Sequence, residues 1–423
     1  MTPHFRYRNR QMYCEGVKIE DIISKVGSPT YIYSKKTIVE AYTEFVSAFK
    51  DIDHLVCYSM KANSNLNVVN ILAKLGSGID CNSGGEIYRA LKVGTDPRKI
   101  IFAGVGKTEE EIRYALHYDI LMFKVESRSE LRAINAIAGE MGKKAPVAIR
   151  VNPDVSVKTH PYIATGLSEN KFGIDSSLAR ESFALAQSLP NIQIVGLDMH
   201  IGSQITEVDP FIEACNKMVL LALELRKAGY NIEHFDLGGG MAIPYKVERP
   251  ASPKDLAEAI GATLNVSDCK IIFEPGRYLV GNAGILVTKV LYTKKHKKKN
   301  FLIVDAAMND LIRPSLYEAY HRIKNVHLKY EESIIADIVG PVCESGDFFA
   351  RNREINKCKQ DDLLAIMSAG AYGMVMSSNY NTRPRIPEVM VDGSKFYITR
   401  ERETYDDIIR KETVFDEIVE NLV

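Results

Sequence analysis

The 423-residue sequence has no excess charge of either sign, because 54 lysines and arginines balance 54 aspartates and glutamates. No overall field attracts nucleic acid or an anionic membrane, so a small-molecule partner is favoured. The seven cysteines include no C-x-x-C pair, which speaks against a zinc site and a disulfide framework. We therefore predict no bound metal, no nucleic-acid partner and a cytoplasmic protein.

Long apolar runs are also missing. No apolar signal core follows the opening MTPHFRYRNRQ, and no segment reaches the ~18 apolar residues of a membrane helix. The sequence thus predicts a protein that is not exported and has no membrane partner.

Short β-rich segments alternate with helical patterns over the first two thirds of the chain. Several, such as Ile100–Ala103, are wholly apolar, as parallel strands covered on both faces should be. No G-x-G-x-x-G opens the first unit, so a (β/α)₈ barrel of the TIM type is favoured over an open Rossmann sheet. The eight predicted strands are 54–60, 78–82, 100–104, 121–125, 146–151, 193–199, 233–237 and 271–274.

Helix signals lie between these strands. Thr108–Glu111 and Ser127–Glu130 fit capping boxes, in which a hydroxyl and a carboxylate satisfy free N–H groups. Residues 67–75 carry a helical apolar stripe that Gly76 ends.

After about Ile285 the pattern changes to strands and turns, which predicts an all-β second domain, a β-barrel or β-sandwich. We expect a barrel domain over 26–280 and a β domain of 281–423, to which residues 1–25 lend a strand. The basic run 294–300 is predicted to be a solvated hairpin tip, with a contact to an acidic partner as the alternative.

Polar or glycine-rich clusters follow the predicted barrel strands, where catalytic groups sit in this architecture. They comprise Lys61, Asp80, Arg150 with Asn152, His200 with Ser203, Gly238–Gly240 and Glu274–Arg277.

Lys61 follows a strand that looks buried. An unpaired buried ammonium is very costly, so its charge has to be removed, as a Schiff base does. A lysine that snorkels to water from the barrel rim is the alternative.

Gly238–Gly240 can surround a phosphate with backbone N–H groups, although such a run is also typical of a tight turn. A lysine and a phosphate cup at one barrel mouth together predict pyridoxal phosphate.

Other residues fit the same cofactor. Glu274 is predicted to hold the pyridine nitrogen protonated, and Arg277 to bind a substrate carboxylate; an Arg–Glu pair that only fixes a loop is the alternative. His200 can stack on the ring or be structural. Ser203 and Tyr372 offer hydroxyls to the phosphate, although most tyrosines simply pack.

Motifs in order along nearly the whole chain resemble the diaminopimelate decarboxylase family, the fold-type III carboxy-lyases that use pyridoxal phosphate. They are YSMKANSN, GIDCNSGGEI, RVNPDV, THPYIATG, KFGI, MHIGSQI, DLGGG, EPGRYLV, GPVCESGD and AGAYG.

The resemblance implies a role for each of these residues. Lys61 would bind the cofactor covalently, and His200 would stack on its ring. The cofactor's phosphate and ring would be bound by Asp80, Ser203, Gly238, Gly239, Gly240, Glu274, Gly276, Arg277 and Tyr372. The substrate would be bound by Arg277, Arg313, Tyr317, Glu344 and Tyr372.

The implied reaction converts meso-2,6-diaminopimelate to L-lysine and carbon dioxide through an external aldimine, the last step of lysine biosynthesis. Cys343 would return the proton to Cα, although a free cysteine is most often a small buried hydrophobe. Cys343 and Glu344 would reach into the partner's site, which implies a homodimer with shared sites. A sister decarboxylase of ornithine, arginine or carboxynorspermidine is the alternative, and a non-catalytic binder of the cofactor a further one.

Two local features qualify the match. Residues 157–174 are too long for an ordinary βα turn and are expected to cover the site, with 159–166 ordering on substrate binding. Met241–Ala242 follows the triple glycine where the family usually has Leu-Gly, so the added methyl of Ala242 is expected to shift the phosphate loop slightly.

Overall fold

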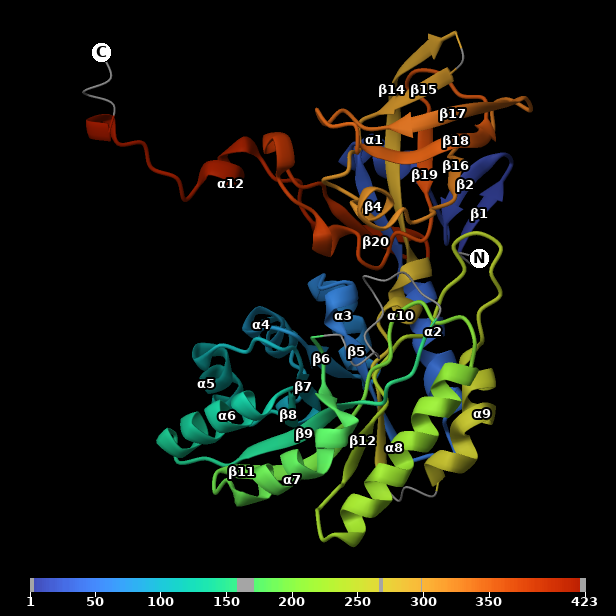
Figure 1. Ribbon diagram of the computed structural model, residues 1–423. Helices are drawn as coiled ribbons and strands as arrows, with labels where there is room; N and C mark the ends of the chain where they lie inside the picture. Colours follow the sequence, from blue (N-terminus) through green and yellow to red (C-terminus); the bar gives the residue numbers. More distant parts are fainter. Residues whose placement is uncertain (1–3, 158–170, 266–268, 298, 419–423) are drawn as a thin grey trace.

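The computed structural model describes residues 4–157, 171–265, 269–297 and 299–418. It has two parts: strands surrounded by helices form the lower one in Figure 1, and a large sheet forms the upper one.

Eight parallel strands form the lower part. They neighbour one another in the order β9-β11-β12-β13-β5-β6-β7-β8, and a further pairing of β8 with β9 closes the barrel. Each predicted strand overlaps an observed one, so the predicted barrel is confirmed. The strands are β5 (His54–Ser59), β6 (Gly78–Cys81), β7 (Ile100–Phe102), β8 (Met122–Val125), β9 (Ala145–Asn152), β11 (Ile192–Asp198), β12 (His234–Asp236) and β13 (Lys270–Phe273), with the short β10 (Ile174–Asp175) beside β9.

Helices surround the barrel because each buries an apolar face against the strands. At α5 both halves of the predicted capping box form between Thr108 and Glu111. At α6 only the Ser127 hydroxyl half forms, because the Glu130 carboxylate accepts from the amide of Glu126 instead. The helices are α2 (Lys35–Ala48), α3 (Leu66–Lys74), α4 (Gly84–Lys92), α5 (Glu109–His117), α6 (Arg128–Glu140), α7 (Ala179–Ser188), α8 (Asp209–Lys227) and α9 (Pro253–Asn265).

The upper part is a mixed sheet in the order β18-β17-β15-β14-β4-β20-β21, with β19 paired to β14 and β16 to β19. The five strands predicted after residue 283 are present, and the basic run flanks the turn of the β14–β15 hairpin. The short β16, the polar β18 and β21 were not predicted. The strands are β4 (Thr30–Ser34), β14 (Gly284–His296), β15 (Lys299–Val304), β16 (Ile323–Asn325), β17 (Ser333–Val339), β18 (Phe348–Asn356), β19 (Leu363–Ile366), β20 (Glu388–Asp392) and β21 (Lys395–Arg400).

The N-terminal residues form a small sheet of their own from β1 (Phe5–Arg8), β2 (Gln11–Cys14) and β3 (Val17–Lys18), followed by α1 (Ile19–Val26). The N-terminal strand that joins the large sheet is not in residues 1–25, as predicted, but is β4, which pairs with β14 and β20. Its residue Ile32 is buried in the core of that sheet. The boundary between residues 25 and 26 stays a prediction.

Short helical segments complete the described chain, and two of them, α10 and η5, link β13 of the barrel to β14 of the large sheet. The short helical segments are α10 (Arg277–Val280), α11 (Arg313–Tyr317) and α12 (Tyr405–Ile409), with the 3₁₀ turns η1 (Met60–Ala62), η2 (Pro97–Lys99), η4 (Ser176–Leu178), η5 (Gly281–Ala283), η6 (Met374–Met376), η7 (Tyr380–Thr382) and η8 (Asp416–Ile418). Among the described residues, no helix has the length and apolarity to span a bilayer.

Candidate active site

A cavity of about 510 Å³ lies where the carboxyl ends of the barrel strands meet α10, α11 and the segment that carries Tyr372. Ten predicted site residues line it: Lys61, His200, Ser203, Gly240, Glu274, Gly276, Arg277, Arg313, Tyr317 and Tyr372. Asp80, Gly238 and Gly239 lie behind this lining, next to residues that form it. Cys343 and Glu344 are not part of it.

Lys61 lies on η1, directly after β5, and its side chain opens into the cavity. Its Nζ is 4.0 Å from Oδ2 of the buried Asp80, and 43% of the side chain is exposed. Surrounding protein lowers the pKa of Lys61, but Asp80 and other acidic groups raise it by more, so the net shift is upward. The amine of Lys61 is therefore neither fully buried nor unpaired, because the strand ends before Lys61 and a carboxylate faces it. Its covalent bond to a cofactor stays a prediction.

Glu274, at the end of β13, belongs to a buried charge cluster at the bottom of the cavity. Nζ of Lys124, on β8, lies 2.5 Å from Oε1 of Glu274 and within 2.8 Å of Asp198 and Asp236. Burial and the neighbouring carboxylates raise the pKa of Glu274, while Lys124 opposes that shift. Three carboxylates face one ammonium, so negative groups outnumber positive ones in this cluster.

Those three carboxylates are close enough together to hold a metal ion. Lys124 already contacts all of them, so its ammonium takes the place that a cation would need.

The triple-glycine loop after β12 depends on the absence of side chains. Gly238 and Gly240 have φ of 67° and 115°, in the region that favours glycine. A Cβ on Gly239 would lie 2.2 Å from the carbonyl oxygen of Glu274, and one on Gly240 would lie 2.6 Å from that of Gly202. The loop therefore brings its backbone close to the neighbouring strand ends. Ala242 is buried behind it, and its amide bonds the carbonyl of Ile205.

These residues fit pyridoxal phosphate. Among the described residues, the amides of Gly240 and Gly276 donate no hydrogen bond, as a phosphate cup requires. The negative cluster around Glu274 suits a protonated ring nitrogen. His200 accepts at Nδ1 from the amide of Gly239, and burial, together with Arg150, lowers the pKa of His200. Its imidazole is therefore neutral and can lie flat on an aromatic ring.

Arg277 and Arg313 form a cationic wall of the cavity. Both are buried, and Nε of each has no hydrogen-bond partner among the described residues. Arg277 stacks over the ring of Tyr372 at 4.7 Å and donates to Ser203. Unpaired buried donors are costly, so this wall is suited to bind an anionic group.

Tyr372 has a left-handed backbone, with φ of 54°. Its amide donates to the carbonyl of Ala62, which ties it to the η1 turn that carries Lys61. A non-glycine residue with this φ is strained, and such strain is concentrated at functional sites.

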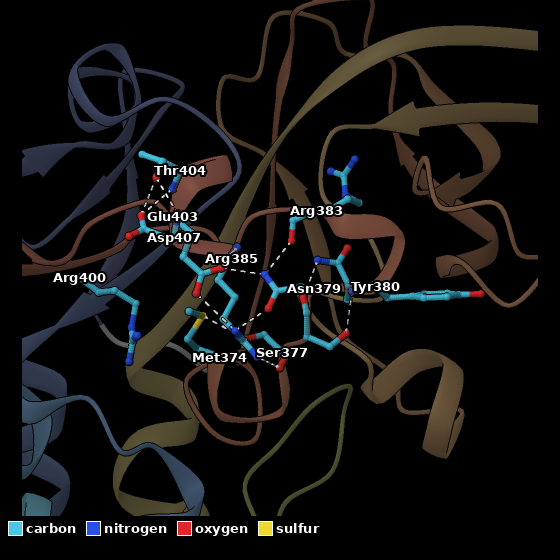
Figure 2. A network of polar contacts seen from close by, with 12 residues as sticks. Met374, Ser377, Asn379, Tyr380, Arg383, Arg385, Arg400, Glu403, Thr404 and Asp407 are labelled. Carbon is cyan, nitrogen blue, oxygen red and sulfur yellow. Dashed lines mark hydrogen bonds and ion pairs between the residues drawn. The ribbon is translucent and has the colours of Figure 1, made fainter. Parts of the chain in front are cut away.

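Cys343 and Glu344 lie in the turn after β17, and both are exposed. The amide of Cys343 donates to the side chain of Asn381, on η7. The segment that carries Asn381 is held by a polar network. Figure 2 shows Asn379, Arg385 and Glu403 at its centre, joined by hydrogen bonds of 2.6–3.3 Å. The turn with Cys343 is thus fixed outside the cavity of its own chain.

Sequence patterns missed two residues that line the cavity and the buried Lys124 beside it. Tyr245 lies in a loop without a motif, and Glu126 directly follows β8. Lys124 contacts Glu274 of the lining but does not itself line the cavity, and it looks like part of an apolar strand. The carboxylate of Glu126 lies 3.4 Å from the guanidinium of Arg150. Its place directly after the predicted strand 121–125 is the sequence signal for Glu126.

Of the predicted cover, residues 157–174, positions 158–170 lie outside the described residues, and these include the segment 159–166 that was expected to order. Phe172, in the described part, lines the cavity.

The comparisons with known proteins point to one family. Residues 35–281 match the family model of the pyridoxal binding domain of pyridoxal-dependent decarboxylases. The diaminopimelate decarboxylase of Aquifex aeolicus is 49% identical, over 96% of this chain and 97% of its own. That of Vibrio cholerae is 48% identical, over 98% and 100%. The Helicobacter pylori diaminopimelate decarboxylase, solved in complex with L-lysine, has a TM-score of 0.90 at 43% identity and covers 93% of this chain and 98% of its own.

Proposed function

The chain belongs to the diaminopimelate decarboxylase family, and from that premise we propose that its cavity converts meso-2,6-diaminopimelate to L-lysine and carbon dioxide, the last step of lysine biosynthesis. The observation that carries the choice of substrate is the buried pair Arg277 and Arg313 in the same cavity as Lys61. Ornithine and arginine each have one carboxylate, which the reaction removes. Only a substrate with a second carboxylate gives this pair an anion to bind throughout the reaction.

Pyridoxal phosphate, when bound, supplies an electron sink for the pair of electrons left on Cα as carbon dioxide departs. Lys61 would hold it covalently. The amides of Gly240 and Gly276 and the hydroxyl of Ser203 would hold its phosphate, while Gly238 and Gly239, whose amides donate to Asp236 and His200, would shape the loop. Glu274 would keep the ring nitrogen protonated. The neighbouring carboxylates favour the protonated form of Glu274, and Lys124 opposes them. His200 would cover one face of the ring.

The remaining residues bind the substrate and return a proton. Arg277, Arg313 and Tyr317 would hold the distal carboxylate, and Glu344 the distal ammonium. The reaction leaves Cα one proton short, and the thiol of Cys343 would donate it. Because Cys343 and Glu344 do not line the cavity of their own chain, they would act in the site of a second copy. A homodimer in the cytoplasm is part of this proposal.

The test of the function is to supply the protein, loaded with pyridoxal phosphate, separately with meso-diaminopimelate, ornithine and arginine. Carbon dioxide and amine products are then measured. We expect release from diaminopimelate alone, with L-lysine as product. Release from ornithine but not from diaminopimelate would transfer the function to the sister decarboxylases, and no release from any of them would favour a binding protein.

Shared sites predict that two inactive variants restore each other. Lys61→Ala removes the cofactor amine and Cys343→Ala removes the proton donor, so a mixed dimer contains one site with both groups intact. We expect each variant to be nearly inactive alone and the mixture to recover up to about a quarter of wild-type turnover, as random pairing allows. Turnover is measured after subunit exchange has been verified by native mass spectrometry. No recovery despite exchange would contradict shared sites.

A further inference from the structure

Tyr245 joins the two arginines of the cavity. Its hydroxyl oxygen accepts from Nη1 of Arg277 at 2.7 Å and from Nη1 of Arg313 at 2.6 Å. Arg277 lies on α10 and Arg313 on α11, far apart in the sequence, and Tyr245 comes from the loop after β12. A single oxygen atom thus fixes how two cations from different segments lie relative to each other.

The position of Tyr245 is itself fixed. The amide and carbonyl of Ile243 are both bonded by the side chain of Gln204, and the amide of Tyr245 donates to Glu248. The guanidinium of Arg313 lies over the Tyr245 ring at 4.9 Å, and the ring of His321 packs edge-on at 5.2 Å. The hydroxyl is therefore held at one place in the cavity wall.

Two buried guanidinium groups that contact the same oxygen atom lie close enough to repel each other. Burial lowers the pKa of Arg313, Tyr245 raises it, and the charge of Arg277 lowers it. The oxygen of Tyr245 offsets part of the repulsion because each cation donates to a lone pair. Since both lone pairs are used, the hydroxyl proton is left to donate, and it has no acceptor among the hydrogen bonds described for Tyr245.

We propose that Tyr245 determines specificity for the carboxylate at the unreactive end of the substrate, by holding Arg277 and Arg313 side by side and donating its own hydroxyl proton to that carboxylate. The inference rests on the proposed function. The ligand class is an amino acid whose carboxylate lies at the end away from the reacting carbon. L-lysine keeps this end of diaminopimelate after decarboxylation, whereas cadaverine, the corresponding diamine, lacks the carboxylate.

The test compares wild type with Tyr245→Phe, both loaded with pyridoxal phosphate. KM and kcat are measured for meso-diaminopimelate, L-lysine binding by calorimetry, and inhibition by cadaverine. We expect KM and the dissociation constant of L-lysine to rise together, roughly ten- to hundredfold, as the loss of a hydrogen bond to a charged group predicts. We expect kcat and cadaverine inhibition to be unchanged, because neither involves the distal carboxylate. Tyr278→Phe, one residue after Arg277 with its hydroxyl bonded outward to Glu44, is the matched control.

Unchanged L-lysine binding in Tyr245→Phe would overturn the proposal, as would an equal weakening of cadaverine, which would indicate a general disturbance of the site. Tyr245→Gln keeps an oxygen acceptor and N–H donors, so it is expected to fall between wild type and Phe, and it carries the test if Tyr245→Phe does not fold. If wild type fails to decarboxylate diaminopimelate, the proposed function is wrong, whereas the calorimetric comparison with L-lysine still decides the role of Tyr245.

Discussion

Lys61→Ala is expected to lower the decarboxylation rate by roughly 10³-fold or more, as the loss of a covalent catalytic group usually does. The fold should persist, because the Lys61 side chain is 43% exposed and its ion pair is a 4.0 Å contact with Asp80. The measurements are carbon dioxide release from diaminopimelate and the thermal unfolding midpoint.

A companion measurement identifies the amine directly. Borohydride treatment of the wild-type protein with pyridoxal phosphate should leave the reduced pyridoxyl group on the peptide that contains Lys61. Lys74→Ala, an exposed lysine on α3, is the control and should behave as wild type. An adduct on another lysine, or a Lys61→Ala variant with wild-type turnover, would refute the assigned site.

Lys124→Met is expected to destabilise the folded protein by about 3–5 kcal/mol near neutral pH, because removing one partner leaves buried charges uncompensated. Methionine has a similar length, so the loss reports the charge and not a cavity. In the wild type, Lys124 lies within 2.8 Å of Asp198, Asp236 and Glu274, and all four side chains are buried. The thermal unfolding midpoint measures the effect, with the exposed Lys144→Met as control.

The loss should depend on pH. Burial raises the pKa of Asp236 to about 7 from its ordinary 3.8, although Lys124 opposes the shift. Between these values the folded protein binds more protons than the unfolded chain, so the contribution of Asp236 to stability falls as pH rises through this window. Without Lys124 the carboxylates are harder to ionise, so Lys124→Met should lose more stability at about pH 8 than at about pH 6. An equal loss at both would mean that Lys124 acts through packing.

Local sequence patterns predict much of the architecture. Apolar segments such as Ile100–Phe102 mark the barrel strands, and their alternation with helices predicts the closed barrel. Parallel strands have their carboxyl ends on one side, so residues after them had to meet at one mouth. For that reason the sequence alone places Lys61, His200, Glu274 and Arg277 at one cavity, where all four lie.

Contacts between distant segments could not be predicted in this way. Lys124 in MFKV looks like a strand residue, and nothing in that segment indicates that Asp198, Asp236 and Glu274 surround it. Tyr245 has no periodic pattern around it, and its partners Arg277 and Arg313 are 32 and 68 residues away.

The order of apolar and polar residues along the chain therefore determined the barrel, its open end and the set of reactive groups there, because strand direction alone brings strand ends together. Only the tertiary structure decided which charges face one another inside the barrel, that Lys61 keeps a carboxylate beside it, and that Cys343 does not line the cavity of its own chain. Those features depend on side chains that meet through closure of the barrel and docking of the second sheet, and no local stretch of sequence encodes them.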